Sequence, residues 1–250
     1  MPVLAEWRTI LVKRLVPLGV LDAISSLKWK IYPLLVRLWP SLAIFLHEPE
    51  STRAFWDAIA PGMLVVDGGA NMGGYSLLAS RRAGADGRVF AFEPDPNNFA
   101  RLLKQIGHLT NVLPVQKAIA ATSGESLLFL DTFHAGHTLV DGRVGEHGIS
   151  VGVTSLDDFV RDHALPGLDV VKLDIEGAEL LAIDGMQSLL RGERRPVILC
   201  EVHPPITPED FISRMNAFAY RTYALDAKLT GGRHDVPVHV LSLPPERDPS

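Results

Sequence analysis

The sequence predicts an α/β fold in which a mostly parallel sheet carries helices on both faces. From residue 63 onward, short stretches rich in Val, Ile and Leu alternate with longer amphipathic stretches, and this alternation is typical of strand and helix units that build a parallel sheet. The apolar stretches contain few polar residues, as expected of strands buried on both faces. At 250 residues, the chain is long enough for one large domain with a well-buried core.

The first half of the predicted sheet contains three strands and two helices. An apolar strand that ends in an acid leads into a helix, and the same arrangement follows once more along the chain. Strands are expected over 63–67, 88–93 and 111–115, and helices over 75–83 and 97–106.

The second half of the chain departs from this alternation at one place. Residues 125–131 follow the turn sequence TSGE and alternate less clearly, so they are interpreted as a hairpin insertion rather than another crossover. The segment 134–148, rich in Gly and His, is expected to be a loop. Strands over 168–174 and 197–203, and a terminal pair over 221–225 and 238–243, complete the predicted sheet.

Residues 1–50 are expected to form a helical segment in front of the main domain, residues 51–250. Apolar residues in 1–46 recur at helical spacing, which fits a layer covering the sheet, a dimer contact, a substrate lid or peripheral contact with a membrane surface. The sequence shows no secretory signal. The longest apolar run, 31–46, is shorter than the ~20 residues that span a bilayer and contains two prolines and an arginine, so no membrane span is predicted.

The composition argues against several classes of protein. Hydrophobic residues make up 47% of the chain and charged residues 21%, which does not fit a disordered or fibrous chain. The net charge of -5, with Lys and Arg scattered, argues against DNA or RNA as a partner. The single cysteine, Cys200, permits no intramolecular disulfide, and it is expected to be a core residue in a reducing cytoplasm.

The segment VVDGGANMGGYS, residues 65–76, has the outline of a nucleotide-binding turn between a strand and a helix. Its glycines let the chain turn sharply and let a ligand approach the backbone. No register matches G-x-G-x-x-G, and the absence of G-K-[ST] excludes a P-loop. Because Asn71 replaces the middle glycine, a pyrophosphate fits less well than a ligand with an amino acid group, such as S-adenosylmethionine.

Glu93 ends the second predicted strand, where an acid about twenty residues after such a turn binds the ribose hydroxyls of adenosine cofactors. Glu93 therefore supports an adenosine-containing ligand. It does not distinguish S-adenosylmethionine from NAD.

Four polar residues are expected to meet at the carboxyl ends of two later strands. Strand alternation places Lys172 and Asp174 on one face of the first strand, and Glu201 and His203 on one face of the next. Ligands bind at this edge of open α/β sheets, so the four residues are predicted to be catalytic. A buried ion pair between Lys172 and either Glu201 or Asp174 would explain the same charges.

Three further residues are candidates for substrate binding. Glu176 and Glu179 fit the acidic first turn of a helix, and Glu176 is also a candidate for contact with substrate. His134 and His137 share a glycine-bearing loop that could close over the substrate, although loop histidines are commonly only solvated. Asp174 and Glu201 could bridge a magnesium ion, but no metal ion is predicted, because two carboxylates without further oxygen ligands are weak evidence.

Three segments resemble the FkbM-type family of S-adenosylmethionine-dependent methyltransferases: VVDGGANMGGYSLL, VFAFEPDPNNFARL and VVKLDIEGAELLAIDGM. The segment ILCEVHP is similar to that family's following strand, and the resemblance covers residues 62–204. It implies a Rossmann-like class I methyltransferase sheet of seven strands with the last strand antiparallel. It also implies O-methylation of a hydroxyl on a sugar, glycan or natural product.

The resemblance also implies roles for individual residues. The first segment would hold the methionine end of the cofactor, and the acid of the second segment would hold the ribose. The predicted cofactor-binding residues are Asp67, Gly69, Ala70, Asn71, Gly73, Tyr75, Ser76, Glu93 and Pro94.

The expected reaction is in-line transfer of the sulfonium methyl group to a substrate oxygen. The hydroxyl needs a base within hydrogen-bond reach, and His203 and Asp174 are the candidates, with Glu201 orienting the histidine. Two other functions stay open at this point: a Rossmann-type NAD-dependent oxidoreductase, and a non-catalytic binding protein that keeps the cofactor fold. The acceptor, a small molecule or glycan, and the oligomeric state cannot be specified from the sequence.

Overall fold

The computed structural model describes residues 48–130, 137–138, 148–225 and 238–248. The segment 1–46 and His134 lie outside the described residues, and of His137 only the backbone is described. The roles expected for these parts of the chain stay predictions. None of the described helices is long and apolar enough to cross a membrane.

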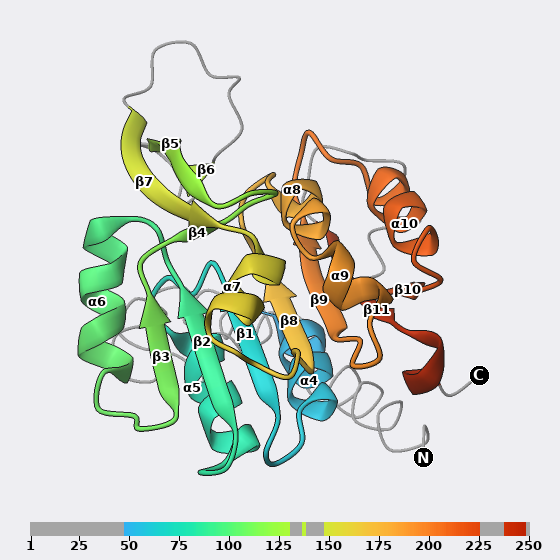
Figure 1. Cartoon of the computed structure of the whole chain (residues 1–250), viewed down its shortest axis with the longest axis horizontal. Helices are drawn as coiled ribbons and strands as arrows, with labels where there is room; N and C mark the ends of the chain where they lie inside the picture. Colours follow the sequence, from blue (N-terminus) through green and yellow to red (C-terminus); the bar gives the residue numbers. More distant parts are fainter. Residues whose placement is uncertain (1–47, 131–136, 139–147, 226–237, 249–250) are drawn as a thin grey trace, which may run out of the picture.

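A seven-stranded sheet forms the centre of the fold (Figure 1). Its strands are β1 (Leu64–Gly68), β2 (Arg88–Phe92), β3 (Val112–Val115), β8 (Val170–Leu173), β9 (Val197–Val202), β10 (Arg221–Ala224) and β11 (Val238–Leu243). The order across the sheet is β10-β11-β9-β8-β1-β2-β3, and in this sheet β11 alone runs in the direction opposite to the other six strands. The prediction of a mostly parallel seven-stranded sheet with an antiparallel last strand is therefore confirmed.

Helices cover both faces of this sheet because successive strand residues point to opposite sides. Val65 of β1 belongs to one apolar core and Val66 to the other. The core of Val65 is completed by residues of α4 (Pro49–Ala58), α5 (Gly74–Ala83) and α6 (Pro96–Ile106). The core of Val66 is completed by residues of α7 (Leu156–Asp162), α8 (Glu179–Asp184), α9 (Gln187–Arg191) and α10 (Pro208–Asn216). A short 3-10 helix, η2 (Pro245–Arg247), follows β11.

The capping residues explain where three of these helices begin. The side chains of Asp95, Ser155 and Thr207 each accept a hydrogen bond from the backbone N–H three residues later. A proline follows Asp95 and Thr207, where its fixed φ suits the first helical position. Local sequence therefore determines these boundaries.

A smaller four-stranded sheet lies beyond the carboxyl ends of β1 and β2 (Figure 1). Its order is β4-β7-β5-β6, and its strands are β4 (Ala118–Ile119), β5 (Gly124–Leu130), β6 (His137–Thr138) and β7 (Gly148–Thr154). The antiparallel pairing of β5 with β6 and β7 confirms the predicted insertion. The predicted loop over 134–148 is wrong for residues 137–138, which pair with Phe129 and Leu130. Strand β7 was missed because Gly148 and Gly152 interrupt its apolar pattern.

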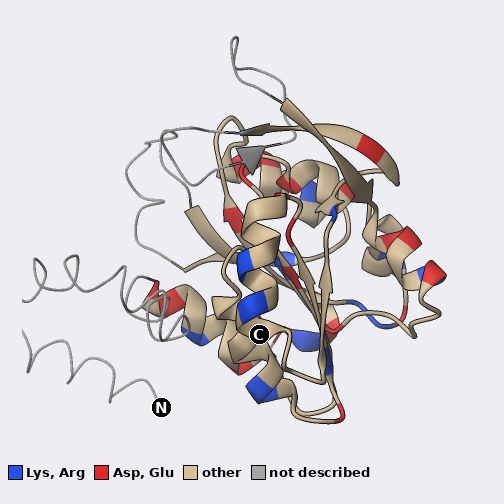
Figure 2. Ribbon diagram, turned by 90° about the vertical axis from the view of Figure 1, so that its left-hand side faces the viewer, with Lys and Arg blue, Asp and Glu red and all other residues tan. Residues whose placement is uncertain are grey.

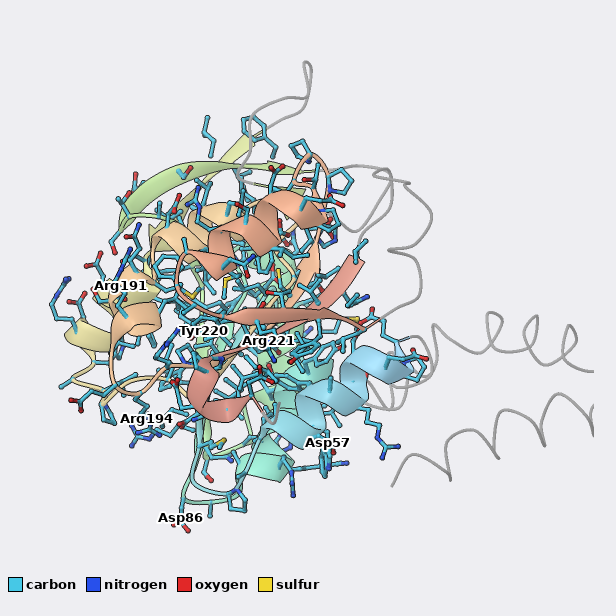
Figure 3. The ribbon with its side chains drawn as sticks, turned by 90° about the vertical axis from the view of Figure 1, so that its right-hand side faces the viewer. Asp57, Asp86, Arg191, Arg194, Tyr220 and Arg221 are labelled. Carbon is cyan, nitrogen blue, oxygen red and sulfur yellow. The ribbon has the colours of Figure 1, made fainter. Side chains whose placement is uncertain are left out.

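Acidic and basic positions are interspersed over the helices and loops of the described part (Figure 2). One group of ion pairs surrounds the buried carboxylate of Asp169 at the start of β8. Asp169 accepts a hydrogen bond from the backbone N–H of Leu64 at 2.8 Å, and its carboxylate pairs with Arg194 and Arg247. Figure 3 shows Arg194 on the side of the molecule away from the smaller sheet. Because this group lies at the amino ends of the strands, it supports the fold rather than the ligand edge.

Candidate active site

The turn between β1 and α5 is built from residues with a left-handed backbone. Gly69, Asn71 and Gly73 have φ values of 73°, 47° and 80°. A Cβ atom on Gly69 would lie 1.8 Å from the backbone oxygen of Asp174, so the loop after β8 leaves room only for glycine there. The backbone N–H groups of Gly69 and Ala70 both donate to the carbonyl oxygen of Phe92, which ties the turn to the end of β2.

Glu93 follows β2 and accepts a hydrogen bond from the backbone of the turn. Its Oε2 atom accepts a hydrogen bond from the N–H of Asn71 at 2.9 Å, and its Oε1 atom accepts one from the N–H of Asp95 at 3.1 Å. The side chain is 5% exposed. Burial raises the pKa of Glu93 to about 7, although the two backbone donors act in the opposite direction.

A pocket that is partly open to solvent lies beside this turn. The pocket lies between the turn, the smaller sheet and the loop that follows β8. Four of the predicted cofactor-binding residues line it, together with three apolar residues and two acids from that loop: Gly69, Asn71, Glu93, Pro94, Phe92, Ile119, Leu128, Asp174 and Glu176.

The other predicted cofactor-binding residues are not among those that line this pocket, and their role in binding stays a prediction. Ser76 donates a hydrogen bond to Asp67 at 2.6 Å, and both side chains are fully buried. The hydroxyl of Tyr75 donates to Glu48 at 2.9 Å. A Cβ atom on Gly73 would lie within 3 Å of two side chains of α6, and Ala70 belongs to the core below the turn. These residues shape the turn by packing.

Lys172 is buried between two carboxylates. Its Nζ atom lies 3.2 Å from Oδ2 of Asp174 and 3.5 Å from Oδ1 of Asp67, and 4.8 Å from the centre of the Tyr75 ring. Burial alone would lower the pKa of Lys172, but the nearby carboxylates raise it above its ordinary value. The ion pair that the sequence offered as the alternative is therefore present with Asp174. Lys172 is a fixed positive charge and not a base.

His203 follows β9 and contacts the buried Glu179, the first residue of α8. Its Nδ1 atom lies 3.0 Å from Oε1 of Glu179 and 3.1 Å from the carbonyl oxygen of Glu201. Both neighbours are hydrogen-bond acceptors, so Nδ1 carries the proton. The expectation that the Glu201 side chain orients His203 is wrong, because the fully buried Glu179 does so.

The other ring nitrogen of His203 faces three carboxylates. Nε2 lies 3.4 Å from Glu176, 3.8 Å from Asp174 and 3.8 Å from Glu201. Burial alone would lower the pKa of His203, but the hydrogen bond to Glu179 and the charges of Asp174 and Glu176 raise it to about 9. The predicted meeting of these polar residues at the carboxyl ends of β8 and β9 is therefore observed.

Glu176 does not belong to the first turn of a helix, as the sequence suggested. Its φ is 54° and the next residue, Gly177, also has a positive φ of 96°, so α8 begins only at Glu179. Burial raises the pKa of Glu176 above its ordinary value, against the opposing effect of His203. The left-handed backbone leaves Glu176 on the pocket wall beside Asp174.

Two residues that the sequence did not single out, His239 and Glu48, extend this network. His239 pairs with Glu201 across β11 and β9, and its Nε2 atom lies 3.4 Å from Glu201 and 3.3 Å from Glu48. Burial alone would lower the pKa of His239, but these two carboxylates raise it to about 10. The alternation in VHVLSL places His239 on one face of its strand, but it does not identify the partner residue.

A family model described as the methyltransferase FkbM domain matches residues 67–225. The chain belongs to the FkbM methyltransferase domain family. The hexuronic acid methyltransferase AglP of Haloferax volcanii is similar to this FkbM chain, with 27% identity over 173 residues. The match covers 68% of this chain, and it spans 64% of the length of AglP.

Two solved structures are similar to this FkbM domain at low sequence identity. Fibrillarin from Aeropyrum pernix, crystallised with bound S-adenosyl-L-methionine, is 13% identical with a TM-score of 0.46, over 74% of this chain and 67% of its own. An S-adenosylmethionine-dependent O-methyltransferase from Thermotoga maritima is 12% identical with a TM-score of 0.47, over 80% of this chain and 67% of its own. Both TM-scores lie below 0.5, so these structures identify neither the acceptor nor the reaction of this chain.

S-adenosylmethionine is the cofactor of this FkbM domain, and the pocket fits it. The Glu93 carboxylate retains free lone pairs that can accept hydrogen bonds from two ribose hydroxyls. Ile119 and Leu128 provide an apolar surface for a flat adenine ring, and the backbone at Gly69 lies at the pocket where a bulkier turn would block a ligand. NAD is not favoured, because the turn keeps Asn71 at the position where close approach of a pyrophosphate needs glycine.

Proposed function

We propose that this FkbM domain transfers the methyl group of S-adenosylmethionine to a hydroxyl oxygen of a sugar, with a uronic acid as the first acceptor to test. The observation that carries the proposal is the meeting of Asp174, Glu176 and His203 at the edge of the pocket that Glu93 and the glycine turn line. The similarity to a hexuronic acid methyltransferase supports a sugar acceptor.

S-adenosylmethionine, when bound, supplies an electrophilic methyl group and leaves as S-adenosylhomocysteine. The acceptor hydroxyl is a weak nucleophile, so a carboxylate within hydrogen-bond reach must take its proton. We assign this role to Asp174. Lys172 holds the Oδ2 atom of Asp174, while the Oδ1 atom is the one that faces His203. His203 is mainly protonated near neutral pH because its pKa is raised to about 9, so in this state it serves as a hydrogen-bond donor and not as the base.

The charges at the pocket edge favour a hydroxyl over a carboxylate as the reacting group. A uronic acid offers both kinds of oxygen. Asp174 and Glu176 line the pocket. Their carboxylates can accept the proton of a hydroxyl, whereas they offer no hydrogen-bond donor to an acceptor carboxylate.

The test is methyl transfer by the purified chain from S-adenosylmethionine that carries a ¹³C-labelled methyl group. Glucuronic and galacturonic acid are compared with glucose and galactose, and the products are analysed by mass spectrometry before and after mild alkali. We expect a labelled product that survives alkali, because a methyl ether is stable where a methyl ester is cleaved. A labile product would mean transfer to the carboxylate, and cofactor binding without any labelled product would favour a non-catalytic binding protein.

The base assignment predicts the effect of Asp174→Asn on the same reaction. Loss of a general base lowers the rate by about 10²–10⁴-fold, so we expect kcat to fall in this range while binding of S-adenosylhomocysteine changes little. The matched control is Asp86→Asn, which makes the same change at an exposed position far from the pocket (Figure 3). An unchanged kcat in Asp174→Asn would refute the assignment.

A further inference from the structure

We infer that Asp174, Glu176 and His203 bind a divalent cation at the edge of the pocket. The inference about the site depends on these residues alone. The part that the cation would play in methyl transfer rests on the proposed function. No metal ion was predicted from the sequence, because two carboxylates without further oxygen ligands are weak evidence for magnesium. The structure adds Glu176, whose carboxylate lies 3.4 Å from Nε2 of His203.

The first argument is the spacing of the three donor atoms. One oxygen of Asp174, one oxygen of Glu176 and Nε2 of His203 lie within 4.8 Å of one another. Ligands about 2.1 Å from a shared ion are about 3.0 Å apart in an octahedral site and about 3.4 Å apart in a tetrahedral site. The distances from Nε2 to the carboxylates, 3.4 Å and 3.8 Å, are close to these values and too long for good hydrogen bonds.

The second argument is the orientation of the imidazole. Metal-binding histidines commonly donate the proton of the second nitrogen to a carboxylate, which fixes the ring and leaves the first nitrogen for the ion. Glu179 supplies this carboxylate at 3.0 Å from Nδ1. Glu179 is fully buried, and among the described residues its Oε2 atom has no hydrogen-bond partner. Protonated His203 balances the charge of this buried carboxylate. When the ion displaces the proton from Nε2, the cation supplies that positive charge instead.

The third argument is the backbone of Glu176. A left-handed conformation at a residue other than glycine is strained, and such residues concentrate at functional sites. The φ of 54° at Glu176 places this acid on the pocket wall together with Asp174. The surrounding structure therefore maintains a strained loop that brings a second carboxylate next to His203.

The donor set suits a divalent ion such as Mn²⁺ or Zn²⁺. Carboxylate oxygens favour Mg²⁺ and Mn²⁺, and the imidazole shifts the preference toward transition metals. Three protein ligands leave coordination positions open toward the pocket, where an acceptor oxygen can bind. A cation there would reduce the repulsion of an anionic acceptor and lower the pKa of a bound hydroxyl. Any proton on Nε2 leaves when the ion binds.

A second cluster provides a matched control. Glu48, Glu201 and His239 also bring three donor atoms within 4.8 Å of one another. None of these residues lines the pocket, whereas Asp174 and Glu176 do. The variant His239→Gln therefore removes the histidine of the neighbouring cluster and leaves the proposed ligands in place.

The experiment titrates Mn²⁺ into the full chain after treatment with a chelator and its removal, by calorimetry and by the electron paramagnetic resonance signal of free Mn²⁺. We expect one bound ion per chain. Glu176→Gln and His203→Ala should each weaken binding about tenfold or more, and Glu179→Gln should weaken it about 10–100-fold. His239→Gln should stay within about twofold of the unmodified chain, because its side chain is not a proposed ligand. Circular dichroism checks that each variant is folded, and Glu176→Gln serves if His203→Ala does not fold.

Absence of Mn²⁺ binding to the unmodified chain would overturn the inference. So would loss of binding in His239→Gln with retention in Glu176→Gln, which would place the ion in the neighbouring cluster. Binding of S-adenosylhomocysteine and methyl transfer are measured separately. Mn²⁺ binding without methyl transfer would support the site and contradict the proposed function, whereas full transfer in chelator without Mn²⁺ binding would support the function and contradict the site.

Discussion

Glu93 both stabilises the turn and lines the pocket in which the cofactor is expected to bind. Its carboxylate accepts two backbone hydrogen bonds that hold the turn, and it also lines the pocket. Burial raises its pKa to about 7, so the charge of Glu93 changes within the range in which the protein can be assayed. A ribose hydroxyl donates a stronger hydrogen bond to a charged carboxylate than to a neutral one.

This pKa predicts the pH dependence of cofactor binding. Below pH 7 the carboxyl is mainly protonated, and above pH 7 it is mainly charged, so affinity should rise with pH. For one group with a pKa of about 7, the affinity for S-adenosylhomocysteine should increase up to about tenfold between pH 6 and pH 8. Calorimetry at several pH values measures this affinity.

The control for this prediction is Glu93→Gln, which has nearly the same shape and cannot ionise. It should bind S-adenosylhomocysteine more weakly at pH 8, and its affinity should vary less between pH 6 and pH 8. A pH dependence that persists unchanged in Glu93→Gln would mean that another group titrates.

The turn between β1 and α5 is the element that joins the cofactor side of the pocket to the acceptor side. Gly69 contacts Phe92 through its N–H and packs against the backbone of Asp174. The loop after β8, which carries Asp174 and Glu176, therefore lies against the turn itself. A change in the turn should disturb both halves of the site.

The variants Gly69→Ala and Gly62→Ala test this close packing. Both glycines have positive φ, 73° at Gly69 and 83° at Gly62, so an alanine at either position destabilises the fold by about 1–2 kcal/mol through its left-handed backbone. A Cβ atom on Gly69 also meets Asp174 at 1.8 Å, whereas one on Gly62 meets nothing within 4 Å. We expect Gly69→Ala to lower the free energy of unfolding by about 3 kcal/mol or more and to weaken cofactor binding. Gly62→Ala should lose only the stability that the left-handed backbone costs. Equal losses in the free energy of unfolding of both variants would contradict the role of packing.

At the scale of the whole molecule, a charged bridge connects three segments that are distant in sequence. His239 of β11 lies between Glu201 of β9 and Glu48, which precedes α4. Burial alone would raise the pKa of Glu48, but His239 and Tyr75 lower it to about 2. The bridge links α4 to the antiparallel side of the sheet, so its charge state should affect the stability of the whole fold.

The raised pKa of His239 predicts a loss of stability at high pH. A histidine whose pKa is higher in the folded protein than in the unfolded chain stabilises the fold. The stabilisation is complete at pH values below 6.5, the ordinary pKa of histidine, and it is lost as the pH rises through about 10. We expect the free energy of unfolding to fall by on the order of 2 kcal/mol between pH 7 and pH 10. Urea denaturation at each pH, in the presence of a chelator, measures the free energy of unfolding.

The control is His239→Gln, which should be less stable at pH 7 and should lose less stability up to pH 10. His203 titrates over part of the same range, so the relevant quantity is the difference between the unmodified chain and the variant. Parallel pH curves for the two proteins would show that the bridge does not contribute.

Much of this fold and part of the site could be predicted from the sequence, because these features depend on local patterns. The alternation of apolar strands and helices predicted the sheet, and period-two alternation predicted that Lys172 lies near Asp174 and Glu201 near His203. The turn chemistry of residues 65–76 and the acid at Glu93 pointed to the cofactor. Each of these inferences needs only neighbours within a few residues or the general rule for the ligand edge of α/β sheets.

The partners of these groups were decided by the tertiary structure. Glu179 reaches His203 across 24 residues of sequence, and His239 meets Glu201 only because β11 pairs antiparallel with β9 in one register. The side chains of Asp67 and Ser76 are fully buried, and Ser76 donates a hydrogen bond to Asp67. Strand order, register and loop conformation depend on packing over the whole molecule. Short-range periodicity shows which face of a strand a side chain occupies, and only the folded chain determines what lies opposite it.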